Sequence, residues 1–313
     1  MNARLQAVQW LLAVLIVLAM PARKAQAQTA KNDARLQALV DEARKTALDK
    51  FAAKKLLTNQ IAITLVDLRD PQRPARASHR GDVQIYPASV IKLFYLAAAH
   101  QWMEDGKLGD TPELRRAMSD MTVHSYNEAT HYVIDLLTGT TSGPELSERE
   151  IKAWFDQRNA VNRYFASLGY ANINANKKPW CEGPYGRETQ AIKLFEPKRN
   201  MLTTDATARL MTEIVSGKAV SAKRSAEMMK LMARDPFARS GDPDNQAKFI
   251  GAALPPGAKL WSKAGWTSQT RHDAAYIELP NGAKIVLIIF TTDHANERDI
   301  IPTIARVIIE GIK

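Results

Sequence analysis

The chain has 313 residues, of which 45% are hydrophobic, as is typical of a globular protein with a buried core. Its formal charge is +10, but the basic residues are interleaved with acidic and apolar ones, so nucleic acid is not an expected partner. A lone cysteine excludes a disulfide within the chain, and the six histidines lack the spacing of zinc ligands. We therefore expect neither a metal nor another cofactor.

The first 27 residues have the layout of a secretory signal peptide. "MNARLQ" carries positive charge, "VQWLLAVLIVLAM" is apolar, and "AQA" (Ala25 to Ala27) offers small residues for cleavage. The apolar run is short for a membrane span, although an uncleaved anchor is the alternative. We expect residues 28–313 to form a periplasmic or secreted monomer that does not bind a membrane after cleavage.

The predicted elements follow in chain order. Apolar residues at helical spacing predict a helix over Asp33 to Lys54. "QIAITLVDL" alternates like a strand, and "RASHRGD" resembles its hairpin partner. Residues 86–225 are mostly helical in pattern, although 169–190 reads as a long structureless segment, a kind of loop that is often functional.

Strand patterns return at the end of the chain. "DAAYIELPNGAKIVLIIFTTD" predicts a hairpin that turns at Pro280–Gly282, and "RDIIPTIARVIIEGI" predicts an amphipathic helix. The predicted fold class is α/β (α+β), with an antiparallel sheet of about five strands and helices on both faces. Residues 28–85 and about 250–313 would form the sheet, and about 86–249 would form an inserted helical lobe within one catalytic domain, 28–313.

The segment "YPASVIKLFY" places Ser89 one helical turn before Lys92. Pro87 suits the first turn of a helix. A serine hydroxyl needs a base to become a nucleophile, and a lysine is a base only when it is neutral. Apolar neighbours and the positive end of a helix dipole both disfavour the charged form of Lys92. The alternative is an ordinary surface lysine.

Two later segments complete a pattern. "HSYNEAT" contains Ser125 and Asn127, and "LWSKAGWTS" contains Lys263 and Gly265. Serine β-lactamases and penicillin-binding proteins carry Ser-x-x-Lys, then Ser-Asp-Asn, then Lys-Thr-Gly or Lys-Ser-Gly, in this order. The chain therefore resembles this family, and specifically its class A β-lactamase-like group.

The resemblance implies a role for each of the catalytic residues. Ser89 would attack a carbonyl and become acylated, while Lys92 accepts or relays the proton of Ser89. Ser125 would pass a proton to the leaving nitrogen with help from Lys263, whose charge also attracts an anionic substrate. The implied partner is a small molecule, either a β-lactam or a peptidoglycan-like substrate.

The resemblance also implies how the substrate is held. Asn127 would donate a hydrogen bond to the amide carbonyl of the substrate. The backbone N–H groups of Ser89 and Trp266 would form the oxyanion hole, where Gly265 allows the backbone to approach closely.

A fourth motif bears on hydrolysis of the acyl-enzyme. In "FEPKRN", Glu196 precedes Asn200 by four residues, the spacing with which class A enzymes hold the hydrolytic water. The resemblance implies that Glu196 is the deacylating base, while the alternative is an exposed acid on a loop.

The match departs from the family in three places. Ala264 replaces the hydroxyl of the third motif, so Lys263 or Thr267–Ser268 would have to compensate. Tyr126 replaces the acid of the second motif. Leu194 stands where an arginine would tie the family's loop, which is also shorter here. These departures concern the substrate and Glu196, not acylation.

Two further side chains have alternative readings. Cys181 is either a reactive thiol or, as we expect, a small buried residue. His124 is expected to be an ordinary surface or core histidine, and the alternative places it along the cleft beside Ser125.

Three functions fit these motifs. The first is an exported β-lactamase that is acylated on Ser89 and deacylated through Glu196. The second is a D-alanyl-D-alanine peptidase, or another amide or ester hydrolase of the superfamily, a reading that Ala264 favours. The third is a sensor-like penicillin-binding module that stays acylated.

Overall fold

The computed structural model describes residues 30–312, and the predicted signal peptide lies outside them. The strands are β1 (Lys31–Asn32), β2 (Ile61–Asp67), β3 (Ala75–His79), β4 (Ala233–Arg234), β5 (Lys259–Trp266), β6 (Thr270–Glu278) and β7 (Lys284–Thr292). The α-helices are α1 (Ala34–Lys50), α2 (Lys92–Glu104), α3 (Pro112–Ser119), α4 (Asn127–Thr138), α5 (Glu148–Arg158), α6 (Ala160–Ser167), α7 (Gly186–Leu194), α8 (Thr204–Val215), α9 (Ala222–Met232) and α10 (Ile300–Gly311).

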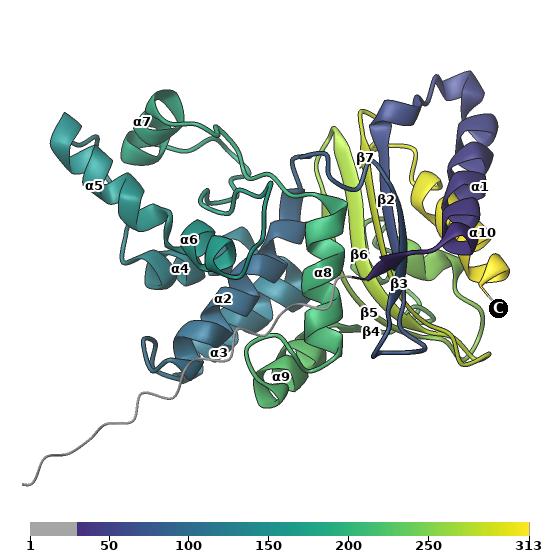
Figure 1. Ribbon diagram of the computed structural model, residues 1–313. Helices are drawn as coiled ribbons and strands as arrows, with labels where there is room; N and C mark the ends of the chain where they lie inside the picture. Colours follow the sequence, from purple (N-terminus) through teal and green to yellow (C-terminus); the bar gives the residue numbers. More distant parts are fainter. Residues whose placement is uncertain (1–29, 313) are drawn as a thin grey trace, which may run out of the picture.

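The strands form one seven-stranded sheet in the order β1-β3-β2-β7-β6-β5-β4 (Figure 1). The five longer strands agree with the predicted number and pair antiparallel, and two-residue strands at the edges raise the total to seven. One of these, β1, pairs in parallel with β3, so the sheet is not wholly antiparallel. Short edge strands leave few unpaired backbone groups at the edges.

Strand β7 shows why the sheet is covered on both faces. Val286, Ile288 and Phe290 pack into a core that the sheet shares with the helical lobe. Residues of α2 and α8 line this core. The alternate residues, such as Leu287 and Ile289, pack into a second core under α1 and α10. Figure 1 shows these two helices on one side of the sheet and the helical lobe on the other.

Helix α2 is the centre of the helical lobe. Its residues 92–100 are all buried, because α4, α6 and α9 surround it. The ring of Phe94 lies 4.8 Å from that of Phe165 on α6, in a tilted aromatic pair. A lysine at the first position of such a helix is therefore surrounded by protein.

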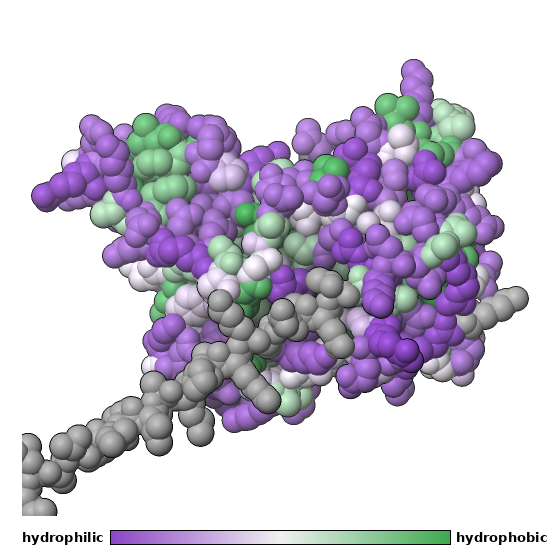
Figure 2. Space-filling view, in the orientation of Figure 1, coloured by the Kyte–Doolittle hydropathy of each residue, from purple (hydrophilic) through white to green (hydrophobic). Residues whose placement is uncertain are grey.

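Helices α5 and α7 form a small outer part of the lobe. The segment predicted to be structureless, 169–190, is helical from Gly186, where α7 begins. Phe155 and Phe195 stack at 4.2 Å, and the buried Arg158 pairs with Glu188 at 2.8 Å. Figure 2 shows hydrophobic side chains gathered over this region on an otherwise largely hydrophilic face.

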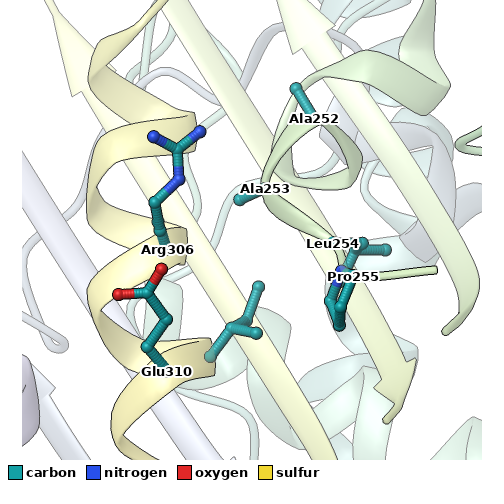
Figure 3. A pocket seen from close by; sticks show the side chains of 7 residues that line it. Ala252, Ala253, Leu254, Pro255, Arg306 and Glu310 are labelled. Carbon is teal, nitrogen blue, oxygen red and sulfur yellow. The ribbon is translucent and has the colours of Figure 1, made fainter. Parts of the chain in front are cut away.

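A hollow of about 440 Å³ lies on the α10 side of the sheet (Figure 3). Arg306 and Glu310 of α10 face residues 252–255 across it. Within residues 30–312, every helix is too short or too polar to cross a bilayer.

Candidate active site

Ser89 lies in a 3₁₀ turn, η3 (Ala88–Ile91), that leads directly into α2. The residue before it, Ala88, has φ +46°, a conformation that a residue with a Cβ rarely adopts. Strand β5 packs against this turn, since a Cβ built on Gly265 would lie 2.6 Å from the backbone nitrogen of Ser89. A glycine at 265 therefore allows β5 to approach the serine.

Lys92 is the first residue of α2, and it is fully buried. Its Nζ donates to the backbone oxygen of Ser125 (2.5 Å), to Oδ1 of Asn127 (2.8 Å) and to Oγ of Ser125 (3.2 Å). Burial lowers the pKa of Lys92 to about 7, against weaker opposing effects of Cys181 and Glu128. A neutral amine is therefore well populated at neutral pH.

Ser125 follows a π-helical turn, η4 (Asp120–His124), and has φ +62°, after which α4 begins at Asn127. The left-handed conformation turns the chain so that both Ser125 and Asn127 contact Lys92. The first and second predicted motifs are thus assembled by hydrogen bonds.

Lys263 of β5 completes this cluster from the other side. Its buried Nζ donates to Oγ of Ser125 (2.9 Å), to Oε1 of Gln246 (2.6 Å) and to the backbone oxygen of Ala264 (2.7 Å). Burial, followed by the positive charge of Lys92, holds the pKa of Lys263 well below its usual value. The Ser125 hydroxyl therefore lies between two buried amines with lowered pKa values.

The Ser89 hydroxyl makes no hydrogen bond to any residue within 30–312, and Ser89 is partly exposed. Trp266 lies next to Gly265 on β5, with its ring 5.6 Å from that of Phe249. An unbonded hydroxyl at the surface of this cluster can be approached by a substrate.

Two residues of the site were not predicted from the sequence. Gln246, in the 3₁₀ turn η5 (Gln246–Lys248), donates from Nε2 to the backbone oxygen of Val123 (2.9 Å) and accepts from Lys263. Cys181 accepts a hydrogen bond from Nδ2 of Asn127 (3.2 Å). The expectation that Cys181 is buried is wrong, because the thiol is exposed in a loop at the edge of the site.

Glu196 and Asn200 are not brought together. The Glu196 side chain is 73% exposed, and the hydrogen bonds and ion pairs that it makes within 30–312 go to Lys198. Asn200 is buried, where its Oδ1 accepts from the backbone nitrogens of Asn176 and Lys177 and its Nδ2 donates to the Lys177 oxygen. The amide of Asn200 is thus used to hold the neighbouring loop.

The departures from the family have distinct surroundings. Ala264 is fully buried in the core under α1 and α10. Tyr126 is 55% exposed, and its ring stacks on that of His124 at 5.3 Å. Leu194 is exposed at the end of α7. Within residues 30–312, no group of three or more His, Cys, Asp or Glu side chains is arranged to hold a metal ion.

Comparison with known proteins identifies the family and the fold. The family described as "Beta-lactamase enzyme family" matches residues 43–312. A β-lactamase from Sphaerobacter thermophilus superposes with a TM-score of 0.63 at 21% identity, over 86% of this chain and 95% of that one. A PBP-A variant, in an acyl-enzyme complex with penicillin G, superposes with a TM-score of 0.60 at 18% identity. The superposition covers 88% of this chain and 96% of that one.

A third structure, the TLA-1 extended-spectrum β-lactamase, gives a TM-score of 0.62 at 15% identity, over 87% of this chain and 98% of that one. At these low identities, the superpositions show a shared fold and nothing finer. No curated protein matches the chain in sequence.

Proposed function

The chain belongs to the beta-lactamase enzyme family, and we propose that it is a serine hydrolase that opens β-lactam amides through an acyl-enzyme on Ser89. Membership of the family supports a β-lactamase-like hydrolase with β-lactam or peptidoglycan-like substrates. The observation that carries the proposal is the Ser125 hydroxyl, which lies between the buried amines of Lys92 and Lys263, beside the turn of Ser89.

Acylation would proceed by three proton transfers. Ser89 Oγ attacks the carbonyl carbon and gives its proton to neutral Lys92. The C–N bond of the amide then breaks, and the nitrogen takes a proton from Ser125, which is resupplied by the lysines. Lys92 bonds to Ser125 and not to Ser89 without substrate, and catalytic hydrogen bonds are often long until substrate binds.

Substrate recognition uses the remaining groups of the cluster. The backbone N–H groups of Ser89 and Trp266 would stabilise the oxyanion, because Gly265 brings β5 against the Ser89 turn. Asn127 Nδ2 would exchange its hydrogen bond to Cys181 for one to the substrate amide carbonyl. Lys263, when protonated, would attract the anionic group of a β-lactam or of a peptidoglycan-like substrate.

A second candidate is a D-alanyl-D-alanine peptidase or a penicillin-binding module that β-lactams acylate and leave acylated. The observation that favours it is the exposure of Glu196, together with the engagement of both amide atoms of Asn200. Glu196 and Asn200 therefore lack the paired arrangement that would orient a water for deacylation. Acylation is common to both candidates.

Nitrocefin separates the two candidates. Sustained hydrolysis by the purified protein supports the β-lactamase, whereas a single burst equal to the protein concentration supports the long-lived adduct. Ser89→Ala is the control and is expected to abolish both signals. Absence of any reaction in the folded wild type would contradict both candidates.

We also propose that the protein is exported, as the pattern of residues 1–27 predicts. N-terminal sequencing of protein recovered from the periplasm or medium is expected to begin near residue 28. Retention of the whole segment in the membrane fraction would instead indicate an anchor.

A further inference from the structure

The hydrogen-bond partners of Lys263 restrict how its amine can exchange protons. Two of them, Oε1 of Gln246 and the backbone oxygen of Ala264, can only accept. They occupy two N–H groups whether the amine is charged or neutral. The remaining direction points at Ser125 Oγ, to which a charged Lys263 donates an N–H and a neutral Lys263 presents its lone pair.

Lys92 is restricted in the same way. The backbone oxygen of Ser125 and Oδ1 of Asn127 take two N–H groups, and Ser125 Oγ lies in the third direction. The Asn127 orientation follows from its Nδ2, which donates to Cys181. Since the Ser125 hydroxyl has one proton, it can donate to only one of the two amines at a time. The amines and Ser125 therefore form one path for a proton.

Gln246 holds one end of this path. Its side chain is buried, and its amide links Lys263 on β5 to Val123 in the turn that leads to Ser125. We propose that Gln246 is a positioning residue that directs the Lys263 amine at the Ser125 hydroxyl and thereby sets the protonation of the path. This inference rests on the proposed function for its catalytic meaning, while the hydrogen bonds themselves do not depend on it.

The charges around the path predict what a change at 246 does. Lys263 faces Lys92 from α2, Arg234 from β4 and the buried Asp273 from β6. Lys92 also faces Glu128 and Cys181. Gln246 adds an acceptor without a charge.

Substitutions of Gln246 act in opposite directions. Gln246→Glu puts a carboxylate on Lys263 and raises its pKa, because an opposite charge favours the ammonium. Gln246→Met keeps the volume but removes an acceptor of the ammonium, so it lowers the pKa. If Gln246 contributed only to stability, the two substitutions would not shift the pKa of Lys263 in opposite directions.

The test is an NMR titration of lysine Nζ groups in the wild type and both variants, with the pH profile of nitrocefin hydrolysis measured in parallel. The Lys263 midpoint is expected to rise by about one pH unit in Gln246→Glu and to fall by a similar amount in Gln246→Met. The alkaline limb of the nitrocefin profile should move in the same directions.

Gln190→Met is the matched control. Gln190 also bridges two segments, since it accepts from the backbone nitrogen of Leu146 and donates to its oxygen, but it lies on α7. Gln190→Met should leave both the Lys263 midpoint and the nitrocefin pH profile unchanged. Three results would overturn the inference: a Lys263 midpoint that moves in the same direction in both Gln246 variants, a midpoint that moves in neither, or a shift in Gln190→Met as large as in the Gln246 variants. A wild type that does not react with nitrocefin would contradict only the proposed function, because the NMR titration still tests the role of Gln246.

Discussion

Gly265→Ala tests the contact between β5 and the turn that carries Ser89. The new Cβ would lie 2.6 Å from the Ser89 nitrogen, 2.7 Å from the Val90 nitrogen and 2.8 Å from the Pro87 oxygen. All three atoms are backbone, so the turn must retreat by about 0.8 Å to restore ordinary contact. A shift of this size separates the two proposed oxyanion donors, and loss of one such donor costs about 10²–10³-fold in rate. Overpacking costs about 1–3 kcal/mol of stability in addition.

The assay is the rate of benzylpenicillin adduct formation by intact-protein mass spectrometry, with thermal unfolding recorded for each variant. Gly251→Ala is the control, because its Cβ meets side-chain atoms of Leu260 at 2.9 Å and Pro236 at 3.0 Å, away from Ser89. It is expected to lose stability but to acylate normally. Acylation of Gly265→Ala at the wild-type rate would refute the proposed oxyanion geometry.

Three further predictions concern the base, the deacylation step and the thiol. Because burial lowers the pKa of Lys92 to about 7, the amine is charged below that pH, and acylation should fall about tenfold per unit on the acid side; a flat pH profile would contradict this. Glu196→Ala should change the lifetime of the adduct by less than about threefold, since its exposed carboxylate pairs with Lys198; an adduct that accumulates would make Glu196 the base, as the sequence predicts. Iodoacetamide should alkylate the exposed Cys181 and slow acylation by about tenfold, because the added group lies beside Asn127 and obstructs the substrate. The acylation rate of Cys181→Ala should not respond to the reagent, and slowing of that variant by iodoacetamide would place the modification elsewhere.

The elements that were predicted correctly are those whose structure follows from the sequence of the segment itself. Alternation in β2, the continuous apolar run of β7 and the Pro280–Gly282 turn predict strands whichever neighbours they acquire. The two-residue edge strands escaped prediction because such short elements exist only through pairing with β3 and β5. Helix α7 has a weak pattern and depends on packing against α5.

Within the site, ordered motifs predicted the cluster of Lys92, Ser125 and Lys263, because their spacing is a property of the chain. Gln246 carries no local pattern, since a glutamine becomes a partner of Lys263 only when η5 is folded beside β5. The exposure of Cys181 likewise depends on how its loop packs.

Peptide mapping after reaction with benzylpenicillin tests the central claim most directly, because it locates the acylated atom. We expect one adduct on the peptide that contains Ser89, and none in Ser89→Ala. An adduct on Cys181, one that persists in Ser89→Ala, or no adduct on the folded wild type would contradict the claim that the two lysines and Ser125 serve acylation of Ser89.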